Sequence, residues 1–505
     1  PEMLGRIFES LLEENIRQKR GAFYTPRHIV KDMCEKSIIN YLNIKLKDTL
    51  TYKEVSDFVT NEKFDVSKND IVKKKAKSID FFLEDIKICD PAIGSGAFAV
   101  GIVNLISRLR VSLKDFVDRK YKNTSYYFKR DCIQNSIYGV DIDISAVEIA
   151  KLRLWLSLIV DEADYASTEP LPNLDYKIMQ GDSLVDEFFG YKFSINEKDK
   201  KQYSLSENPN EIDDLVRELN LLQNKYINLK QFLKRKKIKI KVDNLLIQIF
   251  EKVMSNVDKF DQEKSNELKK LYNYNTTLNQ KRNFFCWELF FAEVFYQKKG
   301  FDLIIANPPY EVLDSKKISS SRISQLRKNS IFDPATEGQL NYFKLFLAKF
   351  LTHLNEDGVS AFIFPNAFLG DKTCTKIRKF VFDKNRLLSL ASYPECDDLN
   401  KRVFRTAKVS VCIAHISKKI VNDHKFTLEV WKDKYKKEGF VATFNKKFIQ
   451  KDIYYRVPAL DNQGLNIYLK ILNNPQVIQL QSIGKVFSGE LDMTNHKKFF
   501  SEKKK

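Results

Sequence analysis

The sequence has few of the residues from which metal sites and disulfide frameworks are built. Seven cysteines and five histidines are scattered along 505 residues, with no C-x-x-C pair and no second ligand at metal-binding spacing. This distribution argues against structural zinc and predicts a protein of the reducing cytoplasm. No apolar run approaches the length of a membrane span, and no signal-peptide pattern opens the sequence.

Acidic residues are also under-represented, with 66 Asp and Glu against 85 Lys and Arg, which leaves a net charge of +19 at pH 7. Such an excess suggests a polyanionic partner, because basic side chains that meet phosphates release condensed counterions. The alternative is a lysine-rich composition that only covers solvated surfaces, and composition does not separate the two. The chain opens with Pro1 rather than Met, so we expect a piece of a longer protein.

Short apolar runs that end in turn residues recur, and helical patterns such as 145–158 and 339–354 separate most of them. The runs are 86–89, 137–140, 176–179, 301–306, 359–364, 387–391 and 408–417. Because most are apolar throughout, they predict a mostly parallel sheet with helices on both faces, which is a doubly wound α/β fold. Ligands of such sheets bind beyond the carboxyl ends of the strands, where the polar residues after each run lie.

The ends and the middle of the chain depart from this alternation. Residues 1–20 have apolar side chains at helical spacing, and Thr25 and Pro26 follow as the expected N-cap and first residue of a second helix. Residues 205–280 are rich in Lys and Asn and predict a helical insertion. We divide the chain into an N-terminal helical element (1–45), two parts of the main domain (46–204 and 281–440), the insertion (205–280) and the start of a further domain (441–505).

The first run leads into a turn, Asp90-Pro91-Ala92-Ile93-Gly94-Ser95-Gly96, which opens a helix. Gly94 and Gly96 let the backbone approach a ligand closely and leave room for an adenosyl or methionine group. Ordinary tight turns use the same residues, so the motif is weak by itself. Its spacing is not the G-x-G-x-x-G of a dinucleotide site, and no P-loop lysine is nearby.

Two carboxylates follow the next two runs. Asp141, in Gly139-Val140-Asp141, can accept hydrogen bonds from both ribose hydroxyls of a nucleoside. Asp182, directly after Gly181, could accept a hydrogen bond from an adenine amino group. A surface aspartate at a helix N-terminus is the alternative for Asp141, as it is for Asp143.

Asn307-Pro308-Pro309-Tyr310 is the most informative motif in the chain. Its prolines hold the backbone rigid, so that the Asn side-chain oxygen and a proline carbonyl can point at one amino group. Two acceptors on one amino group aim the nitrogen lone pair at an electrophile, and transfer of an activated methyl group needs little beyond positioning and electrostatics. Tyr310 offers a face on which an extruded base can stack. A simple Pro-Pro turn after a strand is the alternative for N-P-P alone.

Together, these motifs resemble those of the gamma class of N6-adenine DNA methyltransferases, and more narrowly the methylase portion of fused type IIG restriction-modification enzymes. The resemblance rests on their order from Gly21–Pro26 to Asn307–Tyr310 and covers about residues 1–420. It implies a Rossmann-like methyltransferase sheet whose last strand is antiparallel, S-adenosylmethionine as cofactor and double-stranded DNA as partner. It also implies a target-recognition domain that begins near residue 441, and flipping of the target adenine out of the duplex.

The resemblance assigns roles to individual residues and implies no metal. The residues expected around the cofactor are Thr25, Pro26, Asp90, Ala92, Gly94, Gly96, Asp141 and Asp182. The residues expected at the target base are Asn307, Pro308, Pro309, Tyr310 and Phe404. Of these, Phe404 would be a second stacking aromatic, although a core phenylalanine is equally credible there.

Other functions compete with this interpretation. N-P-P-Y also occurs in enzymes that methylate a glutamine amide of proteins, although the length, the charge and the Gly21–Pro26 motif favour DNA. The chain could also be a DNA-binding modification subunit that depends on a partner. Type IIG relatives have a nuclease domain ahead of the methylase, but the Glu-x-Lys matches here, at 267–269 and 502–504, lack a preceding Pro-Asp, so we expect no nuclease activity in this chain. A cytosine-C5 enzyme is excluded, because no Pro-Cys pair is present.

Overall fold

The computed structural model describes most of the chain between residues 25 and 475. The described residues are 25–47, 49–117, 124–159, 174–188, 191–192, 209–229, 231–255, 263, 266, 284–314, 319–404, 408–436 and 438–475. The helix predicted for 1–20 lies outside them. The chain divides into two compact units, Pro1–Pro458 and Ala459–Lys505, and the candidate site lies in the first.

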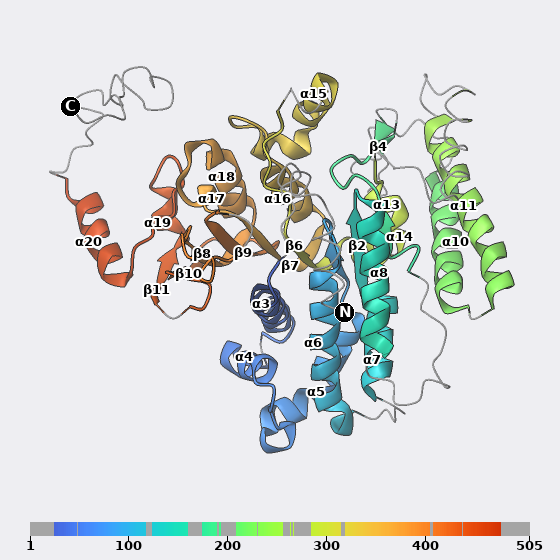
Figure 1. Ribbon diagram of the computed structural model, residues 1–505, viewed down its shortest axis with the longest axis horizontal. Coiled ribbons are helices and arrows are strands. Elements are labelled where there is room, and N and C mark those ends of the chain that lie inside the picture. The colour runs from blue at the N-terminus through green and yellow to red at the C-terminus, as the bar shows by residue number, and fades with distance from the viewer. Residues whose placement is uncertain are drawn as a thin grey trace. The chain divides into compact units, whose positions relative to one another are not determined.

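A nine-stranded sheet with the order β11-β10-β8-β9-β7-β6-β1-β2-β3 forms the centre of the first unit (Figure 1). Its strands are β1 (Ile88–Asp90), β2 (Ile137–Asp141), β3 (Ile178–Gln180), β6 (Phe301–Ala306), β7 (Leu354–Pro365), β8 (Arg386–Tyr393), β9 (Val411–Ser417), β10 (Lys425–Trp431) and β11 (Gly439–Asn445). A separate antiparallel pair is formed by β4 (Glu187–Phe188) and β5 (Tyr191–Lys192).

Each of the seven predicted runs overlaps one strand of this sheet. Strands β7, β6, β1, β2 and β3 pair in parallel, and β9 is antiparallel to both of its neighbours, β7 and β8. The prediction of a mostly parallel sheet whose last strand is antiparallel is therefore confirmed. The sequence analysis did not find β10 and β11, which extend the sheet beyond β8. The domain boundary expected at residue 441 falls inside β11, and the first compact unit continues to Pro458.

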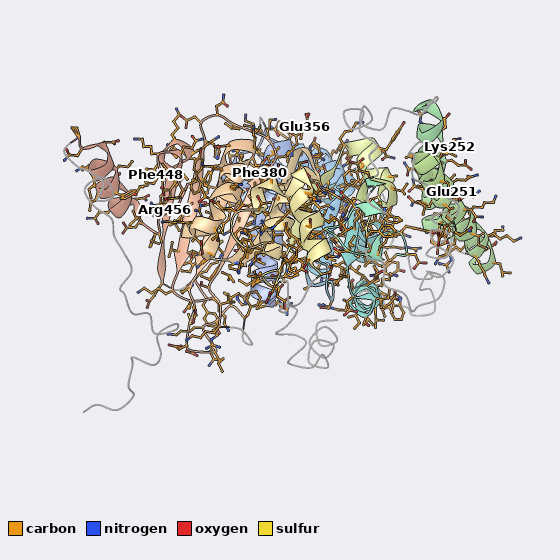
Figure 2. The ribbon with its side chains drawn as sticks, turned by 90° about the horizontal axis from the view of Figure 1, so that it is seen from above. Glu251, Lys252, Glu356, Phe380, Phe448 and Arg456 are labelled. Atoms are coloured by element: carbon orange, nitrogen blue, oxygen red, sulfur yellow. The ribbon has the colours of Figure 1, made fainter. Side chains whose placement is uncertain are left out.

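Helices precede, connect and follow these strands. They are α3 (Arg27–Lys45), α4 (Tyr52–Thr60), α5 (Asp70–Asp85), α6 (Ala97–Leu113), α7 (Thr124–Asn135), α8 (Ile144–Ile159), α10 (Pro209–Asn228), α11 (Phe232–Ser255), α13 (Trp287–Phe290), α14 (Ala292–Lys298), α15 (Ser320–Lys328), α16 (Tyr342–Thr352), α17 (Ala367–Gly370), α18 (Thr375–Lys384), α19 (Lys446–Gln450) and α20 (Asn462–Asn473). The pair α10–α11 lies within the segment predicted as a helical insertion, and Figure 2 labels Glu251 and Lys252 on α11.

The start of α3 differs from the prediction. The helix begins at Arg27, Pro26 occupies the N-cap position with extended backbone angles, and no side chain caps the helix. The prediction that Thr25 is the N-cap was therefore wrong. Its hydroxyl instead accepts a hydrogen bond from the side chain of Asn307, far away in the sequence.

Both faces of the central strands are buried, which explains why the runs are apolar almost throughout. Ile137 on β2 belongs to a core shared with residues of α3, α5, α6 and α8. The next residue, Tyr138, points to the other face, where its ring packs edge-on against Phe291 and Phe301. Because successive side chains of a strand point to opposite faces, the short strand β2 contributes side chains to the hydrophobic cores on both faces of the sheet.

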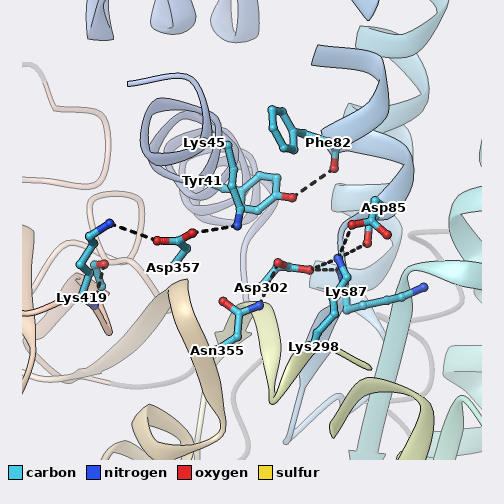
Figure 3. Close-up of polar contacts among 11 residues, drawn as sticks. Tyr41, Lys45, Phe82, Asp85, Lys87, Lys298, Asp302, Asn355, Asp357 and Lys419 are labelled. Atoms are coloured by element: carbon cyan, nitrogen blue, oxygen red, sulfur yellow. Dashed lines mark hydrogen bonds and ion pairs between the residues drawn. The ribbon is translucent and has the colours of Figure 1, made fainter. Parts of the chain in front are cut away.

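A buried carboxylate joins β1 and β6 at their amino ends (Figure 3). Asp302 is 2% exposed and accepts the backbone N–H of Lys87 at 2.9 Å, the Lys298 ammonium at 2.7 Å and the Asn355 amide at 2.9 Å. Nearby, Asp357 pairs with Lys45 and Lys419, but its side chain is 39% exposed. The two aspartates therefore have similar partners and very different burial.

Asp302→Ala should lower the free energy of unfolding by about 3 kcal/mol, because the buried Lys87 N–H and the Asn355 amide lose their acceptor, and the Lys298 ammonium keeps only Asp85. Asp357→Ala, the matched control, should cost less than about 1 kcal/mol, as expected for solvent-exposed ion pairs. Urea unfolding of both variants measures the difference. Equal losses of unfolding free energy in the two variants would show that the buried Asp302 contributes no more stability than the exposed Asp357.

One buried histidine couples stability to pH. His415 on β9 is 2% exposed, and its Nδ1 lies 3.2 Å from the Ser389 hydroxyl. Burial, together with the positive charge of Lys36, lowers the pKa of His415 to about 4. The folded protein therefore keeps this imidazole neutral at pH values where the unfolded chain protonates it.

Because the unfolded histidine binds its proton near pH 6.5, lowering the pH from 7 to 5 should cost about 2 kcal/mol of stability through His415 alone. His415→Asn should remove this contribution. The measurement is the difference between urea unfolding free energies at pH 7 and pH 5 in the wild type and the variant. Identical pH dependence in the two proteins would show that His415 is not responsible.

Candidate active site

The predicted motifs meet at the carboxyl edge of four adjacent parallel strands, β6, β1, β2 and β3. The turn after β1 is tied to β2, because the Gly94 N–H donates to Asp141 Oδ2 at 2.8 Å. It is also tied to the segment after β3, because the Ser183 hydroxyl donates to the Pro91 carbonyl at 2.6 Å. Segments distant in sequence thus form one connected surface.

The turn between β1 and α6 has the open, left-handed geometry that its glycines suggested. Gly94 and Gly96 have φ values of +51° and +80°, which residues with a Cβ rarely adopt. A Cβ on Gly94 would have no neighbour closer than 4.0 Å, whereas one on Gly96 would lie 3.1 Å from the Ala150 side chain. The loop therefore packs tightly on α8 at Gly96 and has open space beside Gly94.

Asp90 and Asp141 differ in their surroundings. Asp90 is 3% exposed, and its carboxylate accepts the Ala92 N–H at 3.1 Å, which stabilises the turn. Burial and the charge of Asp141 raise the pKa of Asp90 well above its ordinary value. Asp141 is half-buried and accepts the N–H groups of Gly94 and Asp143, and burial raises its pKa as well. Of the two, Asp141 is the more accessible acceptor for ligand hydroxyls.

Asp182 lies at the end of β3 and is nearly buried. One carboxylate oxygen accepts the Leu184 N–H at 3.1 Å, and the other forms an ion pair with the Arg322 guanidinium. With Arg322 in place, the Asp182 side chain is 6% exposed. The carboxylate that the sequence predicts for the cofactor adenine is thus already paired with a cation.

The Asn307–Tyr310 segment leaves β6 directly beside the glycine turn. The Asn307 side-chain N–H₂ donates to the Thr25 hydroxyl at 3.1 Å, across 282 residues of sequence. Because the amide is planar, its oxygen points away from Thr25. Asn341 donates to the Tyr310 carbonyl at 3.1 Å, and Pro308 is buried, so the segment is held from several sides.

Two aromatic residues border this segment. The rings of Tyr310 and Phe404 meet edge-on, with their centroids 6.2 Å apart. Phe404 is 2% exposed, and burial raises the pKa of Tyr310 well above its ordinary value. The Tyr310 hydroxyl donates to the Ile363 carbonyl at 3.4 Å. Phe404 therefore lies beside Tyr310 and belongs to the buried hydrophobic core.

Helix α3, which follows Thr25 and Pro26, is held by charges from the far strands. Asp32 pairs with Lys436 at 2.7 Å, and Lys36 pairs with Glu429 of β10 at 2.7 Å. Contacts of Asp32 with Lys36 and of Lys436 with Glu429, at 3.7 and 3.8 Å, close a ring of alternating charges. Strand β10 and the turn that follows it thereby help to fix the helix next to Thr25.

Two basic residues at the site escaped the sequence analysis. Arg153 on α8 is 1% exposed and donates to the carbonyl and hydroxyl of Ser95 at 2.7 and 2.9 Å. These bonds attach the glycine turn to α8. A charged residue on the apolar stripe of the predicted helix 145–158 was a usable signal. Arg322 had none, because only the tertiary structure brings its segment to Asp182.

The structure shows no metal centre and no membrane span in the part of the chain that it describes. No group of three or more His, Cys, Asp or Glu side chains there could hold a metal ion. No helix of that part is long and apolar enough to cross a membrane. All seven cysteines are free thiols, and six are buried.

Residues 135–404, more than half of the chain, match a family model described as the Eco57I restriction-modification methylase. The chain belongs to the Eco57I restriction-modification methylase family. The matched segment includes Asp141, Asp182, Asn307–Tyr310 and Phe404. Methylases of this family use S-adenosylmethionine as methyl donor, and the open turn at Gly94 beside Asp141 suits such a cofactor.

Individual relatives are much longer than this chain. A Methanocaldococcus jannaschii protein named as a type II restriction enzyme and methyltransferase is 28% identical over 467 residues, which cover 83% of this chain and 38% of the relative. The type II restriction enzyme and methyltransferase RM.Eco57I of Escherichia coli is 26% identical over 40% of this chain and 20% of its own length. The solved type IIL enzyme MmeI in complex with DNA aligns over 88% of this chain and 43% of its own, at 12% identity and a TM-score of 0.47, which supports no further conclusion.

Proposed function

We propose that this chain transfers a methyl group from S-adenosylmethionine to the N6 amino group of an adenine in a specific DNA sequence. The observation that supports the proposal most is the Asn307-Pro308-Pro309-Tyr310 segment at the end of β6, held by Thr25 beside the glycine turn of β1. Membership of a restriction-modification methylase family makes DNA the natural substrate. The net charge of +19 suits a polyanion as well.

Different residues of the proposed site contact different parts of the cofactor. In the proposal, Thr25 and Pro26 lie near the methionine part, Gly94 and Gly96 give it room, Asp141 accepts the ribose hydroxyls and Asp182 the adenine amino group. Asp90 and Ala92 act by shaping the turn, since Asp90 is buried and bonded to the Ala92 N–H. The cofactor, when bound, supplies a methyl group activated by its sulfonium.

The target adenine is held by acceptors and by aromatic rings. The Asn307 side-chain oxygen, which its bond to Thr25 turns away from the helix, and the Pro308 carbonyl accept from the N6 amino group, and Pro309 keeps the backbone rigid. These bonds would aim the nitrogen lone pair at the methyl group that a bound cofactor supplies, and the proton that the amino group gives up on transfer would pass to solvent. Tyr310 stacks on the flipped base, with Phe404 supporting it.

The remaining parts of the chain have supporting roles in the proposal. We propose that α10 and α11 within 205–280 form a packing insertion, between the two parts of the methyltransferase domain at 46–204 and 281–440. A target-recognition domain is proposed for the C-terminal segment predicted as 441–505. Because β11 belongs to the sheet, we propose that this domain begins after Pro458. A nuclease domain in a longer parent protein remains a proposal from the names of the relatives.

Asn307→Ala should reduce methyl transfer by about 100-fold or more, because the variant loses an acceptor needed only for the target amino group. Cofactor binding should change little. The assay incubates the purified chain with methyl-labelled S-adenosylmethionine and mixed genomic DNA, followed by nucleoside analysis for labelled N6-methyladenine. Equal losses of transfer and of cofactor affinity would contradict this role of Asn307.

The same assay separates the alternatives. Label in N6-methyladenine supports the proposal, whereas label in protein glutamine and not in DNA would support an amide methyltransferase. Transfer that appears only after a partner protein is added would identify a dependent modification subunit. In each case, binding of S-adenosylmethionine to the chain is measured separately by calorimetry.

Asp141→Ala should weaken cofactor binding by about 1.5–3 kcal/mol, because it removes a charged acceptor of ribose hydroxyls and of the Gly94 N–H. Asp143→Ala is the matched control, since Asp143 accepts the Ser145 N–H at the start of α8 rather than touching the turn. Calorimetric titration of both variants gives the comparison. An unchanged dissociation constant in Asp141→Ala would rule out the ribose role.

A further inference from the structure

Helix α15 belongs to a long excursion between Tyr310 and α16. The base of this excursion is closed by backbone hydrogen bonds, from Leu313 N–H to the Leu340 carbonyl at 2.8 Å and from Tyr342 N–H to the Glu311 carbonyl at 3.1 Å. The excursion is thus anchored where the target-base motif ends.

Arg322 on α15 reaches from this excursion to the other end of the site. Its guanidinium is paired with Asp182, 140 residues away in sequence, on the carboxylate oxygen that the Leu184 N–H does not use. The Arg322 side chain remains 25% exposed, whereas Asp182 is only 6% exposed. The arginine therefore covers the carboxylate and itself keeps access to solvent.

This arrangement conflicts with simultaneous use of Asp182 by a ligand. A carboxylate oxygen can accept more than one hydrogen bond, but only where its surface is open. With 6% of the side chain exposed, almost none of the Asp182 carboxylate is open while Arg322 stays in place. An adenine amino group that approaches Asp182 must displace the guanidinium.

We propose that Arg322 is a further residue of the cofactor site, which competes with the adenine amino group of the cofactor for the Asp182 carboxylate. The proposal rests on the proposed role of Asp182. Arg322 is itself partly solvated, and an amino group that takes its place would keep the Asp182 carboxylate hydrogen-bonded. Cofactor binding is then linked to release of α15, which lies in the segment next to the target-base motif.

The effect on the apparent affinity for the cofactor depends on how many molecules have the Arg322–Asp182 pair in place. If a competing pair blocks the binding-competent form in about two-thirds to nine-tenths of the molecules, the apparent affinity falls about 3- to 10-fold. Replacing Arg322 by alanine should therefore raise the apparent affinity for the cofactor by about the same 3- to 10-fold. A residue that contacts the bound cofactor would have the opposite effect when removed.

The test is calorimetric titration with S-adenosylhomocysteine of the wild-type chain, Arg322→Ala and Lys328→Ala. Lys328 is the matched control, because it lies exposed on the same helix and its loss changes the net charge equally. Arg322→Ala should bind about 3- to 10-fold more tightly, Lys328→Ala should bind like the wild type, and Arg322→Lys should fall between the wild type and Arg322→Ala. Weaker or unchanged binding by Arg322→Ala would overturn the proposal.

A second measurement reports on the helix itself. Hydrogen exchange of the amides in 320–328 should become faster when S-adenosylhomocysteine is added to the wild type, because the displaced arginine no longer anchors α15. Slower exchange would mean that the helix closes on the ligand, which overturns the competition.

Asp182→Ala and Asp141→Ala separate the failures of the two proposals. If both variants bind S-adenosylhomocysteine as the wild type does, or if the wild type does not bind it, the cofactor site itself is wrong. If Asp141→Ala weakens binding and Arg322→Ala leaves it unchanged, only the competition by Arg322 is wrong.

Discussion

The parallel pairing of β1 with β6 is the constraint on which the candidate site depends. Cys89 lies opposite Ile304, and at the amino ends Asp302 accepts the Lys87 N–H and so fixes the two strands against each other. Since parallel strands rise equally per residue, this alignment brings the glycine turn after β1 level with Asn307 after β6. A methyl donor in the turn and an amino group at Asn307 would then be neighbours.

The second constraint is the helix that precedes the sheet. Thr25 reaches Asn307 only because α3 packs over β6 and β7, and the charges of Asp32 and Lys36 fasten that helix to β10 and its turn. The strands beyond β8 are therefore more than an extension of the sheet edge. They belong to the support of the Asn307–Tyr310 segment.

The acidic residues of the site show how burial decides the use of a chemically identical group. Asp90 is enclosed and bonded to its own turn, Asp141 is half-buried and still accessible, and Asp182 is covered by a cation. Sequence motifs treat these three residues alike. Only their surroundings distinguish a residue that shapes a loop from one that can receive a ligand.

Much of the fold could be predicted, because its signals are local. A strand buried on both faces must be apolar throughout, so seven strands of the sheet were visible as runs, and Asp90, Asp141, Asp182 and Asn307 were found as the polar residues that end four of them. Strands β10 and β11 were missed, because their partly exposed residues break the run. The boundary at residue 441 fell inside β11 for the same reason.

The sequence by itself therefore determined the class of fold, the order of the strands along the chain and the residue types at their carboxyl ends. The tertiary structure decided which of those residues have partners and which remain accessible. The Thr25 hydroxyl accepts from Asn307 and does not cap its own helix, Arg153 donates to Ser95, and Arg322 covers Asp182. These contacts join segments far apart in the chain, and long-range pairing depends on packing in three dimensions, which no local pattern of residues encodes.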